Sequence, residues 1–163
     1  GQAASILMAR EGAKVLLSDI DIDRAEETLN TIEKEGGTAK IFIGDVTSEK
    51  DCEAMVNESV KQFGKLDILF NNVGGPGGGM VTEIEEEDWH RSIDLNMKSA
   101  VMGSKYAIPT MEKSGGGSII NVSSIDGTQA GSTRNVPYSI SKAAISHLSR
   151  IISFTKPNPS CKD

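Results

Sequence analysis

The chain has 163 residues, of which 37% are hydrophobic and 25% are charged, and its formal net charge is −6. This composition is typical of a folded globular domain and argues against a disordered chain. No basic stretch is long enough to follow a phosphate backbone, and no apolar run reaches the roughly 18 residues of a membrane span, so we expect neither nucleic acid nor membrane as a partner.

Helices and strands are predicted to alternate along the whole chain. Helix formers end at glycines such as Gly12, short apolar runs predict buried strands, and Ser48 with Asp51 resembles the capping box that opens a helix. The expected elements are a helix over 2–11, a strand over 14–19, a helix over about 23–35, a strand over 40–44, a helix to about 63, a strand over 67–71, a helix over about 86–113, a strand over 118–122 and a helix over about 136–154.

This alternation predicts the fold class. Strands joined through helices lie parallel, so we expect an α/β fold, a doubly wound Rossmann-type parallel sheet with helices on both faces. No repeat or linker interrupts the pattern. Ligands of such sheets bind beyond the carboxyl ends of the strands, so the residues after each apolar run are the first candidates for a site.

Polar residues and glycines follow each predicted strand. They are Asp19, Asp45, the run Asn71-Asn72-Val73-Gly74, and Ser123-Ser124. Each one alone is equally well explained as a helix cap, because acids and asparagines favour that position. Four such coincidences together favour a ligand site at this edge of the sheet.

Tyr138 and Lys142 stand four residues apart at the start of the last predicted helix. This spacing is about one helical turn, so both side chains should lie on one face. A phenol in water ionises only near pH 10, whereas a general acid or base works best near the ambient pH. A lysine cation one turn away, together with an oxidised nicotinamide, would stabilise the phenolate. Taken alone, the pair is also explained as an ordinary surface pair.

Further motifs make the pattern specific. They are Gly44-Asp45-Val46, Asn71-Asn72-Val73-Gly74, Asn96, Ser124 and Tyr138-x-x-x-Lys142. Their order and spacing over residues 1–152 resemble the short-chain dehydrogenase/reductase family, with Val73 in place of the family's usual alanine.

The resemblance implies an oxidoreductase that transfers hydride between a nicotinamide cofactor and a secondary alcohol or ketone. In the family's scheme Tyr138 exchanges a proton with the substrate oxygen, and Lys142 assists the tyrosine and holds the nicotinamide ribose. Ser124 hydrogen-bonds the substrate oxygen, and Asn96 anchors a water in a proton relay.

Ser123 is the rival of Ser124 for the substrate-binding role. We favour Ser124 because side chains alternate along a strand, so that only one of the two faces outward. Ser124 also stands three residues before Gly127, as in the family.

The resemblance also implies the cofactor-binding residues. Asp19, at the end of its strand, would accept hydrogen bonds from the adenosine ribose and repel a 2′-phosphate, which favours NAD over NADP. The alternative is that Asp19 only caps the next helix. The other cofactor-binding candidates are Gly1, Ile20, Asp45, Val46, Asn72, Gly74, Tyr138 and Lys142.

The remaining conspicuous residues receive ordinary interpretations. Pro76 interrupts the glycine-rich run 74–79, so we favour a flexible rim loop over a phosphate loop. His90 is explained by packing or exposure. Cys52 and Cys161 match neither a metal spacing nor a disulfide framework, so we predict no metal site and a cytoplasmic location.

Both ends of the chain depart from the family pattern. The family's first strand and its Thr-Gly-x-x-x-Gly-x-Gly turn would precede Gly1. We therefore expect a partial dinucleotide-binding and catalytic domain over 1–152, incomplete at both ends, and a divergent tail over 153–163. An inactive chain that acts as an interaction or nucleotide-binding product is the alternative function. For a full-length enzyme, the resemblance implies a homodimer or tetramer built on the helices over 86–113 and 136–154.

Overall fold

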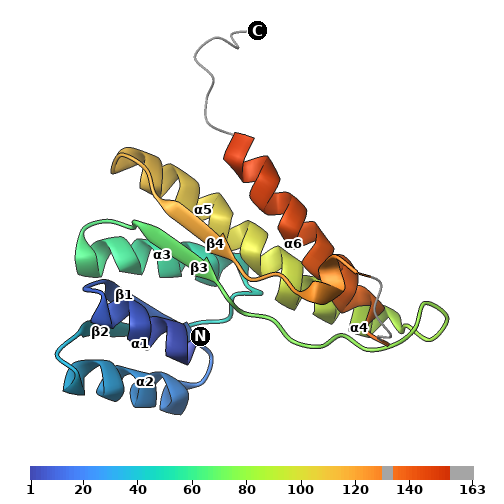
Figure 1. Ribbon diagram of the computed structural model, residues 1–163, viewed down its shortest axis with the longest axis horizontal. Coiled ribbons are helices and arrows are strands. Elements are labelled where there is room, and N and C mark those ends of the chain that lie inside the picture. Colours follow the sequence, from blue (N-terminus) through green and yellow to red (C-terminus); the bar gives the residue numbers. More distant parts are fainter. Residues whose placement is uncertain (130–133, 155–163) are drawn as a thin grey trace, which may run out of the picture. The chain divides into compact units, whose positions relative to one another are not determined.

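The computed structural model describes residues 1–129 and 134–154 (Figure 1). Its contacts divide the chain into two compact units. The first comprises Gly1–Leu69 and Met102–Ser118, and the second comprises Phe70–Val101 and Ile119–Asp163.

The first unit contains a parallel pair of strands, β1 (Lys14–Asp19) and β2 (Thr38–Ile43). Asp19 pairs with Ile43, so both strands end at the same edge. Helices α1 (Gln2–Arg10) and α2 (Ile22–Lys34) lie against this pair and are drawn in blue in Figure 1. Their shared core comprises Ala9, Leu17, Ile32 and Ala39, with Ile6, Val15, Leu29 and Ile41 packed against it. Full burial of a leucine or isoleucine side chain contributes about 1.5–3 kcal/mol, so this cluster holds the four elements together.

Helix α3 (Glu49–Phe63) begins as predicted at Ser48, whose hydroxyl accepts a hydrogen bond from the Asp51 N–H at 3.3 Å. The second bond differs from a capping box, because the Asp51 carboxylate accepts from the N–H of Asp45 at 3.0 Å. Gly64 ends the helix with a φ of +84°, a conformation that favours glycine. The cap thus ties α3 to the segment that follows β2.

Strands β3 (Ile68–Asn71) and β4 (Ser118–Asn121) form a second pair. The Ser118 N–H donates to the Asp67 carbonyl at 2.8 Å, and the Val122 N–H donates to the Asn71 carbonyl at 3.0 Å. From the first bond to the second, donor and acceptor both move the same number of residues toward the C-terminus. The two strands are therefore parallel.

The prediction of a single helix over 86–113 is wrong for the middle of that range. The structure has α4 (Glu86–Ile93), a π-helical turn η1 (Asp94–Lys98) and α5 (Ser99–Lys113). The π turn coincides with buried Asn96, whose side chain donates to the Ser92 carbonyl at 2.9 Å. A π turn often marks a functional position in a helix.

The last helix, α6 (Val136–Phe154), has the predicted bounds, and a short 3-10 turn η2 (Ile125–Gly127) precedes it. Two residues of the predicted tail, Ser153 and Phe154, belong to α6. The rest of that tail, including Cys161, lies outside the described residues. The alternation of helices with parallel strands agrees with the predicted α/β class.

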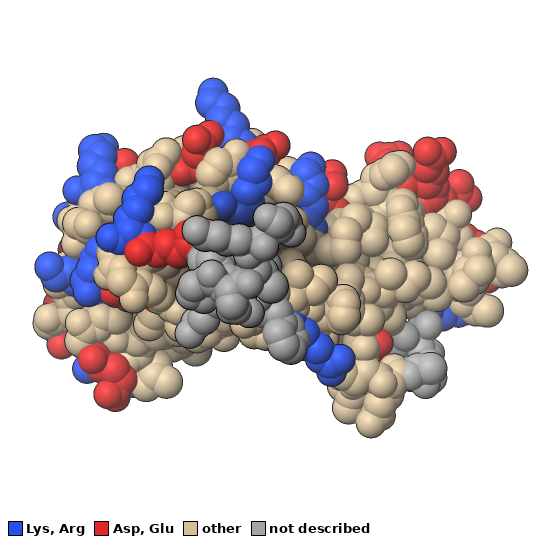
Figure 2. All heavy atoms as spheres, turned by 90° about the horizontal axis from the view of Figure 1, so that it is seen from above, with Lys and Arg blue, Asp and Glu red and all other residues tan. Residues whose placement is uncertain are grey.

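The described surface carries charged side chains of both signs. Figure 2 shows one face, on which lysine and arginine side chains lie among aspartates and glutamates. Arg10, for example, donates to Glu35 at 2.6 and 2.7 Å and thereby lowers the pKa of that carboxyl. Such exposed pairs contribute little to stability. None of the described helices has the length and apolarity that crossing a bilayer would take.

Candidate active site

Tyr138 and Lys142 lie one turn apart on α6. Pro137 occupies the first turn of this helix, where its missing N–H costs nothing, and the Ser139 N–H closes the turn on the Asn135 carbonyl at 2.9 Å. The Nζ of Lys142 lies 5.7 Å from the centroid of the Tyr138 ring. The prediction that both side chains share one face is therefore confirmed.

Lys142 is almost fully buried, with 3% of its surface exposed. Its Nζ donates a hydrogen bond to the Val122 carbonyl at 2.9 Å. Burial disfavours the charged form and lowers the pKa of the Lys142 ammonium. An ammonium has three donors, and the Val122 carbonyl uses one of them.

Asn96 joins the π turn to the loop after β3. Its Nδ2 donates to the Gly75 carbonyl at 2.9 Å, and its Oδ1 accepts from the Gly75 N–H at 3.0 Å. We call this two-bond contact the Asn96 clamp. A Cβ on Gly74 would lie 2.8 Å from Asn96 Oδ1 and 2.9 Å from Lys142 Nζ, so only glycine fits there without a shift.

The two candidate serines have different neighbours. Ser123 faces α6, because its Oγ donates to the Lys142 carbonyl at 2.8 Å and lies 2.7 Å from the Oγ of Ser146. Ser124 caps the η2 turn, because its Oγ accepts from the Asp126 N–H at 3.2 Å. A hydroxyl that accepts in this way keeps its own proton for another bond.

A cavity of about 380 Å³ lies beside these side chains in the second unit. It is lined by Asn72, Gly74, Gly75, Pro76, Val122, Ser123, Asn135, Tyr138 and Lys142. Four predicted site residues therefore meet here, whereas Asn96 holds the loop at Gly75 and Ser124 is not in the lining. Within the described residues the Tyr138 hydroxyl has no hydrogen-bond partner.

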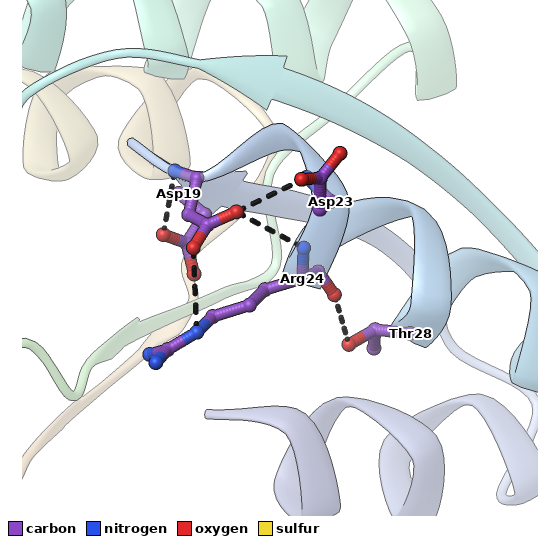
Figure 3. A network of polar contacts seen from close by, with 5 residues as sticks. Asp19, Asp23, Arg24 and Thr28 are labelled. Carbon is purple, nitrogen blue, oxygen red and sulfur yellow. Dashed lines mark hydrogen bonds and ion pairs between the residues drawn. The ribbon is translucent and has the colours of Figure 1, made fainter.

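Asp19 ends β1 in the first unit, and its Oδ1 accepts a hydrogen bond from the Asp21 N–H at 3.0 Å. The cap of α2 is Asp21, whose Oδ1 accepts from the N–H groups of Asp23 and Arg24 at 3.1 and 3.2 Å. Figure 3 shows this network, with Arg24 and Thr28 in the turns that follow. The alternative that Asp19 caps the helix is therefore wrong.

Asp45 and Val46 follow β2 at the edge where β1 also ends. The Gly44 N–H donates to the Asp19 carbonyl at 3.1 Å, which joins the two strand ends. The Asp45 carboxylate accepts from both the N–H and the hydroxyl of Thr47, each at 2.8 Å. These bonds fix the turn that carries Asp45 and Val46.

Gly1 and Ile20 complete the predicted residues of the first unit. Gly1 is the N-cap of α1 and carries no side chain over the first N–H groups of that helix. Ile20 is 73% exposed. A large apolar side chain exposed to this degree at a strand end is available to a ligand.

Two residues beside the site were not predicted from the sequence. Asn135 lines the cavity and forms an isolated parallel bridge with Gly79, and Ser146 contacts Ser123. For Asn135, the available signal was its place directly before the helix of Tyr138. The bridge and the Asn96 clamp hold the glycine-rich loop at two points. No group of three potential metal ligands occurs within residues 1–129 and 134–154.

Residues 1–155 match the short chain dehydrogenase family. The chain is 43% identical over 150 residues to an uncharacterized oxidoreductase of Thermotoga maritima, covering 92% of this chain and 59% of that protein. It is 37% identical over 157 residues to the 7α-hydroxysteroid dehydrogenase of Escherichia coli K12, covering 94% of this chain and 60% of that enzyme. The chain therefore belongs to the short-chain dehydrogenase family.

A solved structure of the family has the same fold. It is a 7α-hydroxysteroid dehydrogenase complexed with NADH and 7-oxo glycochenodeoxycholic acid, and it matches with a TM-score of 0.87 at 36% identity. The match covers 94% of this chain and 60% of that chain. The predicted Rossmann-type fold is thereby confirmed, and the chain spans about 60% of the length of these relatives.

Proposed function

We propose that the protein containing this chain transfers hydride between NAD(H) and a secondary alcohol or ketone. The arrangement of Tyr138 and Lys142 carries the proposal, because one cavity is lined by a buried ammonium and by a phenol to which the described residues give no hydrogen-bond partner. Burying a charged group is costly unless it is well paired, and a carbonyl oxygen is the bonding partner that the described residues give Lys142. That cost favours a chemical role for the lysine.

Tyr138 is the proposed proton donor and acceptor. In the direction of reduction its hydroxyl donates a proton to the substrate oxygen, and in oxidation the phenolate takes the proton of the alcohol. The Lys142 ammonium, 5.7 Å from the ring centroid, favours the phenolate by its charge. Ser124 is proposed to donate its free proton to the same substrate oxygen. Asn96 is proposed to support the proton relay, since its clamp fixes Gly75, the neighbour in the chain of Gly74, which lies against Lys142.

The residues present fit a nicotinamide dinucleotide. The bound cofactor would supply or accept the hydride. Lys142 and Tyr138 are proposed to hold the nicotinamide ribose, with Asn72 and Gly74 lining the same cavity. The absence of a side chain at Gly74 lets the loop backbone lie close to Asn96 and Lys142. The solved relative with bound NADH supports the same proposal.

NAD is proposed over NADP because of Asp19. The Oδ1 of this carboxylate accepts a hydrogen bond from the Asp21 N–H, and the described residues offer no hydrogen-bond partner to Oδ2. A free carboxylate oxygen at a strand end can accept from a ribose hydroxyl and repels a phosphate. Gly1, Ile20, Asp45 and Val46 are proposed as the further contacts of the dinucleotide.

Changing Asp19 to asparagine in the intact protein should narrow the preference for NAD over NADP. The substitution removes the charge but keeps the shape, so the ratio of kcat/KM values for the two cofactors should fall by about tenfold or more, or ~1.4 kcal/mol. Steady-state kinetics with both cofactors measures this ratio. Asp21→Asn makes the same charge change at the helix cap and should leave the ratio unchanged. Equal effects of the two variants would contradict the role of Asp19.

A turnover assay tests the proposed function as a whole. The intact protein is incubated with NAD and secondary alcohols, including 7-hydroxysteroids, or with NADH and the matching ketones, and absorbance at the NADH band is followed. We expect turnover of at least one such pair. Saturable NADH binding by calorimetry without any turnover would favour the alternative of an inactive nucleotide-binding chain.

The intact protein is further proposed to form a homodimer or tetramer. Ile140 and Ile151 are 46% and 49% exposed, and they stand three turns apart on one face of α6. Light scattering at micromolar concentration should give at least a dimer, and Ile151→Glu should weaken it. Leu7→Glu, at an exposed leucine of α1, is the control and should not change the mass. A wild-type monomer would contradict this proposal.

A further inference from the structure

The backbone carbonyl of Lys142 accepts hydrogen bonds from two serine hydroxyls, which lie on different parts of the chain. Ser123, two residues after the end of β4, donates to it at 2.8 Å, and Ser146 on α6 donates at 3.2 Å. The two serine oxygens lie 2.7 Å from each other. Ser123 therefore joins the end of β4 to α6 at the residue that carries the buried ammonium.

The segment Val122–Ser123 binds both the side chain and the main chain of Lys142. The Val122 carbonyl accepts from the side-chain Nζ at 2.9 Å, while the Ser123 hydroxyl donates to the main-chain carbonyl. Gly127 packs directly against the main chain of Lys142, since a Cβ at this glycine would lie 2.6 Å from the Lys142 carbonyl carbon. The position of α6 along β4 is therefore fixed at this residue.

We infer that Ser123 is a positioning residue, which sets Tyr138 and Lys142 in place without touching the substrate. This inference rests on the proposed function of that pair. Tyr138 lies one turn before Lys142 on the same rigid helix, so a shift of α6 at Lys142 moves the phenol by a similar distance. A misplacement of about 1 Å can cost up to roughly 100-fold in rate.

Ser123→Ala in the intact protein should lower kcat by about tenfold while KM changes little, because binding groups remain and only their alignment is lost. Ser149→Ala is the matched control. The Asn121 side chain donates to the Ser149 hydroxyl at 2.9 Å, so this variant also removes a bond that joins β4 to α6, but two turns beyond Lys142. Both variants should lower the melting temperature, and only Ser123→Ala should lower kcat.

A second pair of variants separates the hydroxyl from the volume of the side chain. Ser123→Thr keeps the donor and should retain most of kcat, whereas Ser123→Val has the same shape without the donor and should behave as Ser123→Ala does. Equal activity of the threonine and valine variants would overturn the inference. So would a kcat of Ser123→Ala within about twofold of wild type, which is less than 0.5 kcal/mol.

The wild-type result separates the inference from the proposed function. An inactive wild type would refute the proposed function. An active wild type, with equal losses of kcat in Ser123→Ala and Ser149→Ala, would refute the positioning role of Ser123 alone.

Discussion

Tyr138→Phe should abolish turnover in the intact protein while leaving the affinity for NADH within a few-fold. Phenylalanine keeps the ring in the cavity and its contact with Lys142, and it removes only the hydroxyl that exchanges the proton. The measurement is kcat at saturating substrate, together with calorimetric titration of NADH. More than about a tenth of wild-type kcat, a loss under ~1.4 kcal/mol, would contradict the role assigned to Tyr138.

Tyr106→Phe is the matched control, because it removes the other phenol of the chain. The Tyr106 hydroxyl donates to the Glu49 carboxylate at 2.9 Å, and this bond raises the pKa of Tyr106. The two tyrosines thus have opposite surroundings, since Tyr106 is bonded to an acid and Tyr138 faces an ammonium. A phenol next to a carboxylate is poorly suited to lose its proton, so we expect wild-type kcat for Tyr106→Phe.

Gly127→Ala should destabilise the intact protein strongly and lower its activity. The added Cβ would lie 2.6 Å from the Lys142 carbonyl carbon and 2.7 Å from the Ala143 nitrogen. Both atoms belong to the backbone of α6, so the helix or the η2 turn has to move. Overpacking of this kind costs about 1–3 kcal/mol, which corresponds to a fall in melting temperature of several degrees. Thermal unfolding followed by circular dichroism measures the change.

Gly78→Ala is the control for this prediction. A Cβ on Gly78 would meet no atom within 4 Å. Any effect of the substitution on chain entropy alone should therefore appear in both variants, and only Gly127→Ala should show the additional loss. Similar melting temperatures for the two variants would mean that η2 yields to the methyl group without cost.

Those parts of the fold that depend on local patterns were predictable from the sequence. The strand β1 and the helix α6 have the predicted bounds, because an apolar run and the residues at helix ends act within a few positions. Strand β2 begins at Thr38 instead of at Lys40, which is the usual uncertainty at an element end. The class of fold followed from the alternation alone.

What the sequence could not predict depends on contacts between distant residues. The π turn at Asn96 accompanies a bond to Gly75, which lies 21 positions away, and no local pattern encodes such a pair. The same holds for the burial of Lys142 and for the contact between Ser123 and α6. Spacing alone placed Tyr138 and Lys142 on one face, but it could not show that Ser123 and Ser124 have different partners.

The Asn96 clamp has a consequence for the energetics of ligand binding. A carboxamide carries the same N–H and C=O groups as a peptide bond, so Asn96 pairs with Gly75 as a residue of a neighbouring strand would, although no strand is there. The loop backbone is thereby ordered by a surrogate β-bridge before any ligand arrives. A ligand that contacts Gly74 and Gly75 does not bear the entropy of ordering them, and more of its contact energy remains as affinity.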